Sequence, residues 1–441
     1  MTKQSAIILS SLLSLLVACP AAEAFCPPSS STQQHQRTQL FMSTTDAAAS
    51  AASSSTTTTT TDEDEQSLAA TVSKLKRVLA KEYTSFFNPM VDSWYAPDVT
   101  FVDPMTSLSG VDSYRKNVDM LAGRTLMGKV LFEGAGINLH SVTGGQIVKD
   151  SAQDGSNNIL RVEDIVTRWT LRLTAKILPW SPEAVFSGVS VYKIQLGGTE
   201  GLSIVGQTDY WDSINIQPNT SSSNVKQQYQ TVPKNIAMSD FLSQLAPSGF
   251  LAPTAAPELP YLLLRRGNGY EVRKYPGFVG IETPYMRRDY GFGSLGAFAK
   301  GMDPLAPSIC KVWNDDYVDE GDGKEKMMMW PLKFALPGEG TDAPPAPPAA
   351  IEKAGSGQWA SINVMSQPET IVAIRAFEDA AMGPVVRNAD RELRAILKRD
   401  GLVAKDGSDQ YVVFTQYDAV HSMGKRRSEV WIELKDGGHP F

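Results

Sequence analysis

The spacing of apolar positions changes along this chain, and each change indicates a different kind of element. After an acidic segment at 62–65, the apolar residues Val72, Leu75 and Leu79 recur every three or four positions, which predicts a helix. Acidic residues stabilise the N-terminus of a helix, and Pro89 is expected to follow its end. Ordered structure is therefore predicted to begin directly after residue 65.

A second helix is predicted at 109–121, and strand-like runs follow it. Helices followed by a series of β-segments predict an α+β domain, in which a curved antiparallel sheet wraps around its helices. The strand-like runs are 130–132, 136–142, 158–173, 183–196 and 202–214.

The rear part of the chain repeats a strand–helix–strand pattern. The first copy contains a strand at 270–275, a helix at 291–301 and an apolar run at 327–336. Such a duplication predicts a small barrel or paired sheet with one helix in each half. An apolar groove between helix and sheet would then bind a flat apolar ligand. The second copy comprises a strand at 368–377, a helix at 385–398 and strands at 411–417 and 426–434.

Amino-acid composition distinguishes the two predicted domains from the segments that precede and connect them. Ser and Thr dominate 43–65, which is too polar to form a core and is predicted to be disordered. The Pro-, Ser-, Gln- and Ala-rich segment 217–258 is predicted to be a linker with one short helix at 238–245. The expected order is a targeting segment 1–42, the disordered segment 43–65, an α+β domain 66–216, the linker 217–258 and a second domain 259–441.

The first residues have the pattern of a targeting signal. Lys3 precedes an apolar stretch at 6–18 and a small-x-small triplet at 22–24, as in a secretory signal peptide. Phe25 follows at once, and then a Ser/Thr-rich, acid-poor stretch that contains Arg37. A signal peptide followed by Phe and a transit-like segment resembles the two-part plastid address of diatoms and related algae. This resemblance implies a plastid protein, and plain secretion is the alternative.

Charge and cysteine content exclude several classes of protein. The formal net charge of −7 argues against general affinity for nucleic acid. No apolar stretch after the targeting segment is long enough for a membrane span. Cys19 and Cys26 lie in that segment, which leaves Cys310, and one cysteine forms neither a disulfide framework nor a zinc site. No metal site is predicted.

Several motifs of the rear domain resemble the SOUL haem-binding family. They are YEVRKY at 270–275, GFGSLGAF at 291–298 with a glycine after it, PETIVAIRAF at 368–377 and RRSEVWIEL at 426–434. They occur in family order over 261–435. The resemblance implies a distorted β-barrel with two helices that binds haem or a related tetrapyrrole.

The front domain resembles an uncharacterised plant and algal domain. DVTFVDP at 98–104, GVDSY at 110–114, RWTL at 168–171 and YWD at 210–212 carry this resemblance. That domain belongs to the nuclear-transport-factor-two-like superfamily and precedes SOUL domains. The resemblance implies a cone-shaped α+β fold.

A porphyrin site needs an apolar slot, cations near the propionates and, in some proteins, an axial ligand. The first helix of the rear domain offers Phe292, Leu295 and Phe298 on one face, with the small residues Gly296 and Ala299 between them. Small residues let a flat ring approach the helix closely. The alternative is that this face packs on its own sheet.

The apolar run at 327–336 adds adaptable and aromatic side chains. Alternation along a strand places Met327 and Met329 on one face and Met328 on the other, and Trp330 could stack on a ring. Core packing is the alternative for these residues, and a solvated surface role is the alternative for each cation. The cations proposed to meet propionates are Arg287, Arg288 and Lys300.

The sequence selects no axial ligand for iron. The histidines of the SOUL-like region, His421 and His439, lie far in sequence from its first helix, so binding through apolar contact fits better. A methionine or Cys310 is the alternative donor. The acidic insertion at 302–326 lacks the spacing of a calcium loop and is interpreted as a solvated loop.

The resemblance to the SOUL family, together with the predicted groove, implies a non-enzymatic tetrapyrrole carrier or buffer of the plastid with no catalytic residues. One alternative is an association with plastid lipid bodies, or a protein-interaction module whose groove holds an isoprenoid or a partner helix. Another is a small-molecule enzyme in the front domain that would use Asp103, His140 and Tyr95.

Overall fold

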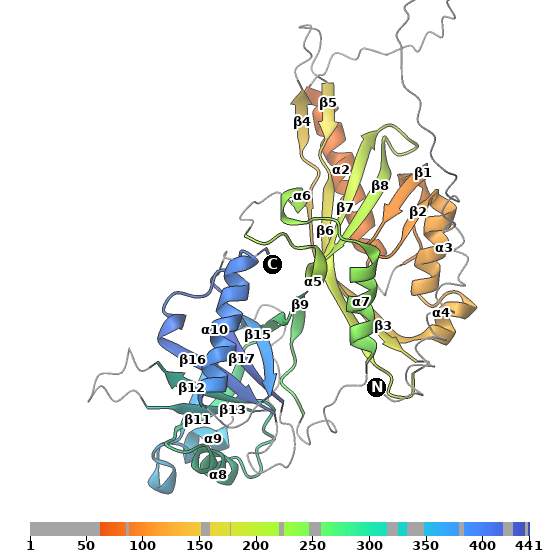
Figure 1. Ribbon diagram of the computed structural model, residues 1–441. Helices are drawn as coiled ribbons and strands as arrows, with labels where there is room; N and C mark the ends of the chain where they lie inside the picture. The colour runs from red at the N-terminus through yellow and green to blue at the C-terminus, as the bar shows by residue number, and fades with distance from the viewer. Residues whose placement is uncertain are drawn as a thin grey trace, which may run out of the picture.

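The protein contains two domains, each built on its own β-sheet (Figure 1). The computed structural model describes residues 62–84, 88–150, 159–176, 178–219, 225–246, 257–314, 325–332, 348–378, 383–417, 427–436 and 440–441. The targeting segment 1–42 lies outside these residues. Helix α2 (Asp62–Glu82) begins inside the segment 43–65 that was expected to be disordered, so that boundary was placed too late.

The N-terminal domain has a six-stranded sheet in the order β2-β1-β8-β7-β6-β3. Neighbouring strands are antiparallel except β1 and β8, which are parallel, so the expectation of a wholly antiparallel sheet is wrong at this pair. No hairpin sets the direction of β1 relative to β8, because they are the first and last strands of the sheet in chain order. The strands are β1 (Tyr95–Val102), β2 (Ser107–Ser109), β3 (Phe132–Gly144), β6 (Ile165–Ala175), β7 (Glu183–Leu196) and β8 (Leu202–Trp211), and β4 (Ile147–Asp150) pairs separately with β5 (Ile159–Val162).

Helices pack against this sheet and complete an α+β domain. Leu75 and Leu79 of α2 are fully buried, as their spacing predicts. The predicted strand at 130–132 is mostly the end of a helix instead, since α4 extends to Leu131. The remaining helical elements are η2 (Asp92–Trp94), α3 (Val111–Leu121), α4 (Leu126–Leu131), α5 (Asp212–Asn215), α6 (Val225–Gln228) and α7 (Lys234–Leu245).

Helix α7 lies within the segment interpreted as a linker. Its residues Ala237, Phe241 and Leu245 are buried in the N-terminal core. The sequence signalled a short helix but not its packing, because the apolar residues of α7 are few. The segment 234–245 is therefore a structural part of the N-terminal domain.

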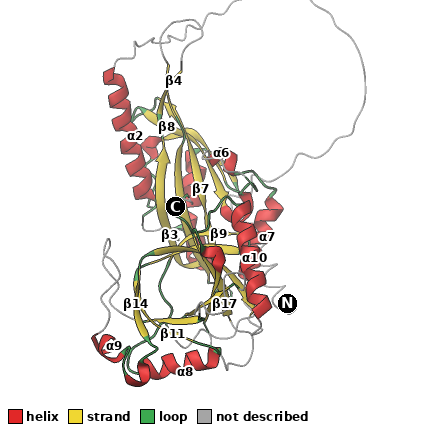
Figure 2. Cartoon of the chain, turned by 90° about the vertical axis from the view of Figure 1, so that its left-hand side faces the viewer, coloured by secondary structure: helices red, strands yellow, loops and turns green. Residues whose placement is uncertain are grey.

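The C-terminal domain has a nine-stranded antiparallel sheet in the order β14-β11-β13-β12-β16-β17-β15-β10-β9, curled almost into a ring (Figure 2). α8 (Arg288–Phe298) belongs to the first half of the repeat and α10 (Gly383–Arg399) to the second, as predicted, and the short helix α9 (Pro348–Lys353) lies between them in the chain. The other elements are β9 (Leu262–Gly267), β10 (Tyr270–Tyr275), β11 (Phe278–Pro284), β12 (Ser308–Trp313), β13 (Met327–Pro331), η4 (Gly357–Trp359), β14 (Asn363–Gln367), β15 (Thr370–Glu378), η5 (Ser408–Gln410), β16 (Tyr411–Gln416) and β17 (Arg427–Glu433).

Each face of the curled sheet has its own apolar cluster. α8, α9 and α10 lie outside the ring, and their buried side chains join one face of the sheet in what we call the outer cluster (Figure 2). Tyr275, Phe278 and Trp431 belong to a smaller cluster on the opposite face, the inner cluster. Strands buried on both faces explain why their sequences are apolar without clear alternation.

A buried ionic network joins the two domains. Asp212 of α5 accepts hydrogen bonds from Arg168 Nη2 at 2.8 Å and Tyr229 Oη at 2.6 Å. Arg265 of β9 places its Nε 3.9 Å from the same carboxylate. Burial alone would raise the pKa of Asp212, but the charges of Arg168 and Arg265, together with the hydrogen bonds that the carboxylate accepts, hold that pKa below its usual value. Strand β9 of the C-terminal domain is thus fixed against the N-terminal sheet.

Further contacts between the domains come from neighbouring residues of the same strand. The backbone N–H of Arg266 donates to Ser187 Oγ at 2.7 Å, and its guanidinium forms an ion pair with Asp240 of α7 at 3.0 Å. Thr170 Oγ1 donates to the carbonyl oxygen of Leu263 at 3.0 Å. In the part of the chain that the structure describes, no helix is both long and apolar enough to cross a membrane.

Candidate ligand-binding site

Helix α8 buries two of the residues proposed to meet a ligand. Leu295 and Phe298 are fully buried in the outer cluster. Phe298 meets Trp359 edge-to-face, with ring centroids 5.5 Å apart. This face of α8 packs on its own sheet, so a ligand would reach either side chain only by displacing core contacts.

Phe292 and Trp330 lie at the margin of this core and contact one another. Their rings meet edge-to-face with centroids 5.7 Å apart, and both side chains are half-buried. A Cβ at Gly296 would lie 3.5 Å from the ring of Trp330, so the glycine lets the helix backbone approach the indole. The structure thus brings together Phe292, Gly296 and Trp330, which the sequence singled out.

The methionines of β13 divide between the two faces, as strand alternation predicts. Met328 is fully buried in the outer cluster beneath α8, where a Cβ at Gly291 would approach its Cε to 3.1 Å. Met329 packs against the inner cluster instead. Met327 shares a face with Met329, so neither of these two proposed residues faces α8. Met328 is the methionine that the proposed site lacked.

The solvent-facing side of α8 consists of small residues. Gly293, Gly296 and Ala297 are exposed between Tyr290, which is 67% exposed, and the end of the helix. We call these four residues the α8 outer face. They lie on the exposed side of the helix, whereas Leu295 and Phe298 of its buried side belong to the outer cluster. Met286, just before the helix, is 90% exposed. The described residues therefore leave this side of the helix without bulky side chains except Tyr290.

Cations lie at both ends of the α8 outer face. Arg287 is exposed at the N-terminal end, where it pairs with Asp289 at 2.9 Å and lies over the Tyr290 ring. Lys300 is exposed just beyond the C-terminal end. Arg288 points elsewhere, since its guanidinium lies 6.0 Å from the ring centroid of Phe414 in the outer cluster.

Sequence reasoning missed one cation near α8. Lys353 of α9 donates from Nζ to the carbonyl oxygen of Phe298 at 2.7 Å, and it lies 4.9 Å from the Trp359 ring centroid. A lysine that caps the last turn of a helix is stabilising because the carbonyl groups there lack helical donors. No local sequence signal connects α9 with α8, so this contact depends on the tertiary fold.

The inner face of the sheet carries a satisfied charge network. Glu429 Oε2 accepts hydrogen bonds from Tyr417 Oη at 2.7 Å and from Arg273 Nη1 at 3.2 Å. Trp431 stacks on Tyr275 with centroids 4.7 Å apart. Burial and the Glu429 charge raise the pKa of Tyr417 far above its usual value. Because its donors and acceptors pair with one another, this network stabilises the curl of the sheet.

The candidate axial donors receive little support. His421, His439 and residues 315–324 of the insertion lie outside the described residues. The interpretation of 302–326 as a solvated loop is wrong for 308–313, which forms β12 between β13 and β16. Cys310 is fully buried in the outer cluster. Among the residues that the structure describes, no group of three or more His, Cys, Asp or Glu could hold a metal ion.

The three titratable residues considered for an enzyme lie in different environments. Asp103 lines a cavity of the N-terminal domain. His140 Nε2 lies 2.8 Å from Thr170 Oγ1, and burial, followed by the Arg168 charge, lowers its pKa to about 4. Tyr95 donates to Glu82 at 2.6 Å. The structure therefore does not assemble these three side chains into one site.

Comparison with known families decides the nature of the C-terminal domain. Residues 256–433 match the family model described as SOUL heme-binding protein. The C-terminal domain is a SOUL domain. Residues 73–199 match a second model, described as Uncharacterized conserved protein (DUF2358). No curated protein matches the chain.

Solved structures resemble parts of the chain at low identity. A hydrolase from Listeria innocua is 10% identical with a TM-score of 0.27, and the similarity covers 41% of this chain and 94% of that one. Nuclear transport factor 2 from Cryptosporidium parvum is 11% identical with a TM-score of 0.20, covering 31% and 90%. EcmrR, in a complex with DNA, is 9% identical with a TM-score of 0.25, covering 38% of this chain and 57% of that one.

Proposed function

We propose that the SOUL domain binds haem or a related tetrapyrrole and acts as a carrier or buffer that catalyses no reaction. The match of residues 256–433 to the SOUL heme-binding family carries this proposal. The α8 outer face supplies the binding surface. There the tetrapyrrole ring lies across Gly293, Gly296 and Ala297, with Tyr290 beside one edge.

The shape of this surface favours a flat ring. Tyr290 and Phe298, the last residue of α8, are eight residues apart, so the helix between them extends about 12 Å. A Cβ at Gly293 would meet no atom within 4 Å, so the space above the glycine is open. Apolar contact over such an area drives binding without an axial ligand.

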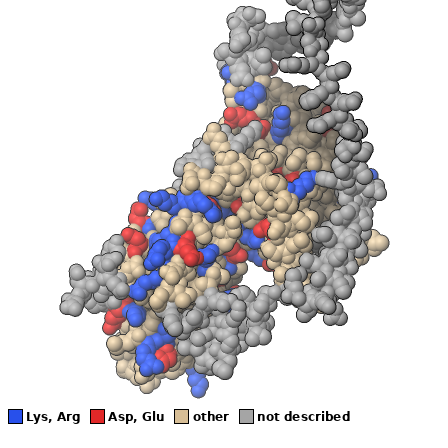
Figure 3. Space-filling model, viewed as in Figure 1, with Lys and Arg blue, Asp and Glu red and all other residues tan. Residues whose placement is uncertain are grey.

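The charges at the ends of α8 favour a ligand with carboxylates. Arg287 and Lys300 are exposed and can turn toward propionate groups at the edge of the ring. On the face shown in Figure 3, Lys and Arg side chains gather mainly over the C-terminal domain. Asp and Glu side chains lie among them, so the proposed attraction for an anionic ligand rests on Arg287 and Lys300 at the ends of α8.

A substitution on the α8 outer face is expected to weaken ligand binding without lowering the stability of the domain. Gly293→Gln puts a side chain where the ring is proposed to lie, and it is expected to weaken binding of haemin and of protoporphyrin IX at least tenfold. The same change raises helix stability by about 0.5–1 kcal/mol, because glycine is a poor helix former. Ala395→Gln on the exposed face of α10 is the matched control, and its binding is expected to equal that of the wild type.

Absorbance titration of the full chain measures this binding, and thermal unfolding measures the stability of each variant. Equal affinity of wild type and Gly293→Gln would contradict a site on α8. Binding of a fluorescent isoprenoid or of lipid droplets, with no saturable porphyrin binding, would favour the lipid-body alternative.

The protein is also proposed to be targeted to a plastid. The signal-peptide pattern and transit-like segment in residues 1–42 support targeting to a plastid. A fusion of residues 1–61 to a fluorescent protein should accumulate in the plastid of a diatom, and Phe25→Ala should redirect it. Secretion of the unaltered fusion would contradict this part of the proposal.

A further inference from the structure

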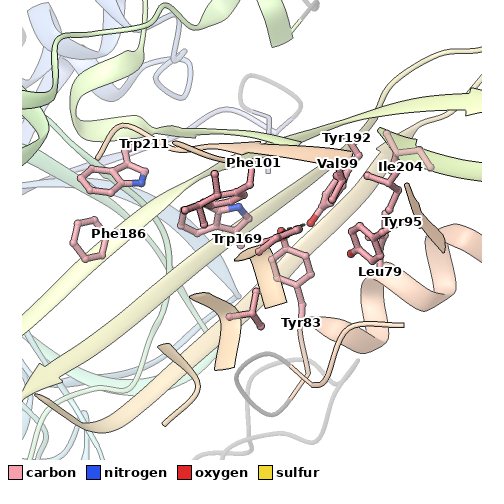
Figure 4. Close-up of a cluster of buried hydrophobic side chains, with 14 of the residues drawn as sticks. Leu79, Tyr83, Tyr95, Val99, Phe101, Trp169, Phe186, Tyr192, Ile204 and Trp211 are labelled. Carbon is pink, nitrogen blue, oxygen red and sulfur yellow. Dashed lines mark hydrogen bonds between the residues drawn. The ribbon is translucent and has the colours of Figure 1, made fainter. Parts of the chain in front are cut away.

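The N-terminal domain contains a cavity of about 190 Å³ between its sheet and helices α3 and α7. Aromatic side chains from several strands surround it. Figure 4 shows Phe101 close to Trp169, and Phe186 close to Trp211, where the ring centroids are 4.5 Å apart. An engineered apolar cavity of about 150 Å³ binds benzene, so this space is large enough for one aromatic ring with a short substituent.

Two carboxyl groups line the same cavity. Asp103 accepts two hydrogen bonds at Oδ1, from the backbone N–H groups of Met105 and Thr106. No hydrogen-bond donor among the described residues reaches its Oδ2. Asp209 accepts a hydrogen bond from Gln207 Nε2 at 2.7 Å. The acidic groups therefore retain capacity to accept hydrogen bonds from a ligand.

The surroundings of these carboxyls are acidic and phenolic. Burial raises the pKa of Asp209 to about 7, and the charge of Asp103 adds to this shift. Burial raises the pKa of Asp103 to about 6, opposed by its hydrogen bonds and by Lys234 of α7. Tyr83, Tyr114 and Tyr192 also face Asp209, while Glu82 acts on Tyr114 from α2.

We propose that this cavity binds a small aromatic amine as its monocation, with the ammonium between Asp103 and Asp209 and the ring among the aromatic walls. Three observations select a cation. The carboxyls have unused acceptor capacity, the described lining residues include no Lys, Arg or His, and aromatic faces attract cations. This site lies in the other domain and is independent of tetrapyrrole binding.

Three probes that share a phenyl ring and differ in charge test this proposal on the full chain. Calorimetry at pH 7.5 should show that phenethylamine binds at least tenfold more tightly than neutral 2-phenylethanol, and that 3-phenylpropionate does not bind. Affinity for the amine should fall as pH decreases from 7.5 to 5.5, because the carboxyls become protonated. No binding of the amine, or equal binding of amine and alcohol, would overturn the proposal.

A paired substitution locates the binding. Asp209→Asn keeps the acceptor for Gln207 but removes the charge, so the preference for amine over alcohol should fall at least tenfold. Asp240→Asn, a carboxylate on α7 that pairs with Arg266, is the matched control and should bind the amine as the wild type does. An unchanged preference in folded Asp209→Asn would place the amine elsewhere and overturn the proposal.

Discussion

At the scale of single residues, burial shifts the pKa of Glu82, whereas at Asp212 the charged partners outweigh burial. Glu82 of α2 is almost fully buried and accepts hydrogen bonds from Tyr95 Oη at 2.6 Å and from the Val91 N–H at 2.8 Å. Burial outweighs these donors and raises the pKa of Glu82 from 4.5 to about 7. The folded state therefore binds a proton at Glu82 more tightly than the unfolded state does.

This shift makes stability depend on pH. A raised carboxyl pKa contributes stability that is present below pH 4.5 and is lost as pH rises to about 7. Glu82→Gln removes the titration, so the variant should gain stability relative to the wild type, on the order of 2 kcal/mol, between pH 5 and pH 8. Urea unfolding at both pH values measures the difference.

Glu63→Gln, exposed near the start of the same helix, is the control for removing a carboxylate from α2. A Glu82→Gln variant whose stability relative to the wild type does not change with pH would show that burial does not shift this group.

At the scale of elements, α8 has two faces with different roles. Leu295 and Phe298 hold the helix on the sheet, while Gly293, Gly296 and Ala297 remain open to solvent. The packing face contributes to the free energy of unfolding, and the exposed face is available to a ligand.

Truncation of a side chain on the packing face should therefore lower the free energy of unfolding of the domain. Phe298→Ala is expected to reduce the free energy of unfolding by about 3–5 kcal/mol, because it empties a fully buried site. Phe292→Ala, at the half-buried margin, should have less than half that effect. Denaturant unfolding of both variants compares them, and equal losses would contradict the assignment of the two faces.

Periodicity predicted most of the elements, and it placed Phe292, Leu295 and Phe298 on the face of α8 that the structure packs against the sheet. The run at 183–196 coincides with β7, and the predicted helices at 109–121 and 385–398 correspond to α3 and α10. The sequence left open whether this face of α8 binds a ligand or packs on the sheet, because apolar residues serve both purposes. The contact of Lys353 and the parallel β1–β8 pair result from tertiary contacts between distant segments.

At the scale of the whole molecule, the two domains form one structural unit around Asp212. Its side chain is completely buried with Arg168, and Arg265 reaches it from the other domain. A buried charge is tolerated only with partners, so the network fixes the domains in one arrangement.

Removal of this charge should destabilise both domains together. Asp212→Asn leaves two buried guanidinium groups without a counter-charge, which is expected to cost about 3–5 kcal/mol. Asp240→Asn breaks a more exposed pair between the domains and should cost about 1 kcal/mol. Hydrogen exchange followed in both sheets measures the effect, and destabilisation confined to one domain would contradict a shared network.

The titration of haemin into the full chain, followed by absorbance, tests the proposed function most directly. The SOUL domain is expected to give a saturable, one-to-one shift of the Soret band, which Lys300→Glu weakens and Lys398→Glu on α10 leaves unchanged. Protoporphyrin IX should bind with similar affinity if apolar contact on α8 suffices. A folded protein that saturates with neither ligand would contradict tetrapyrrole binding.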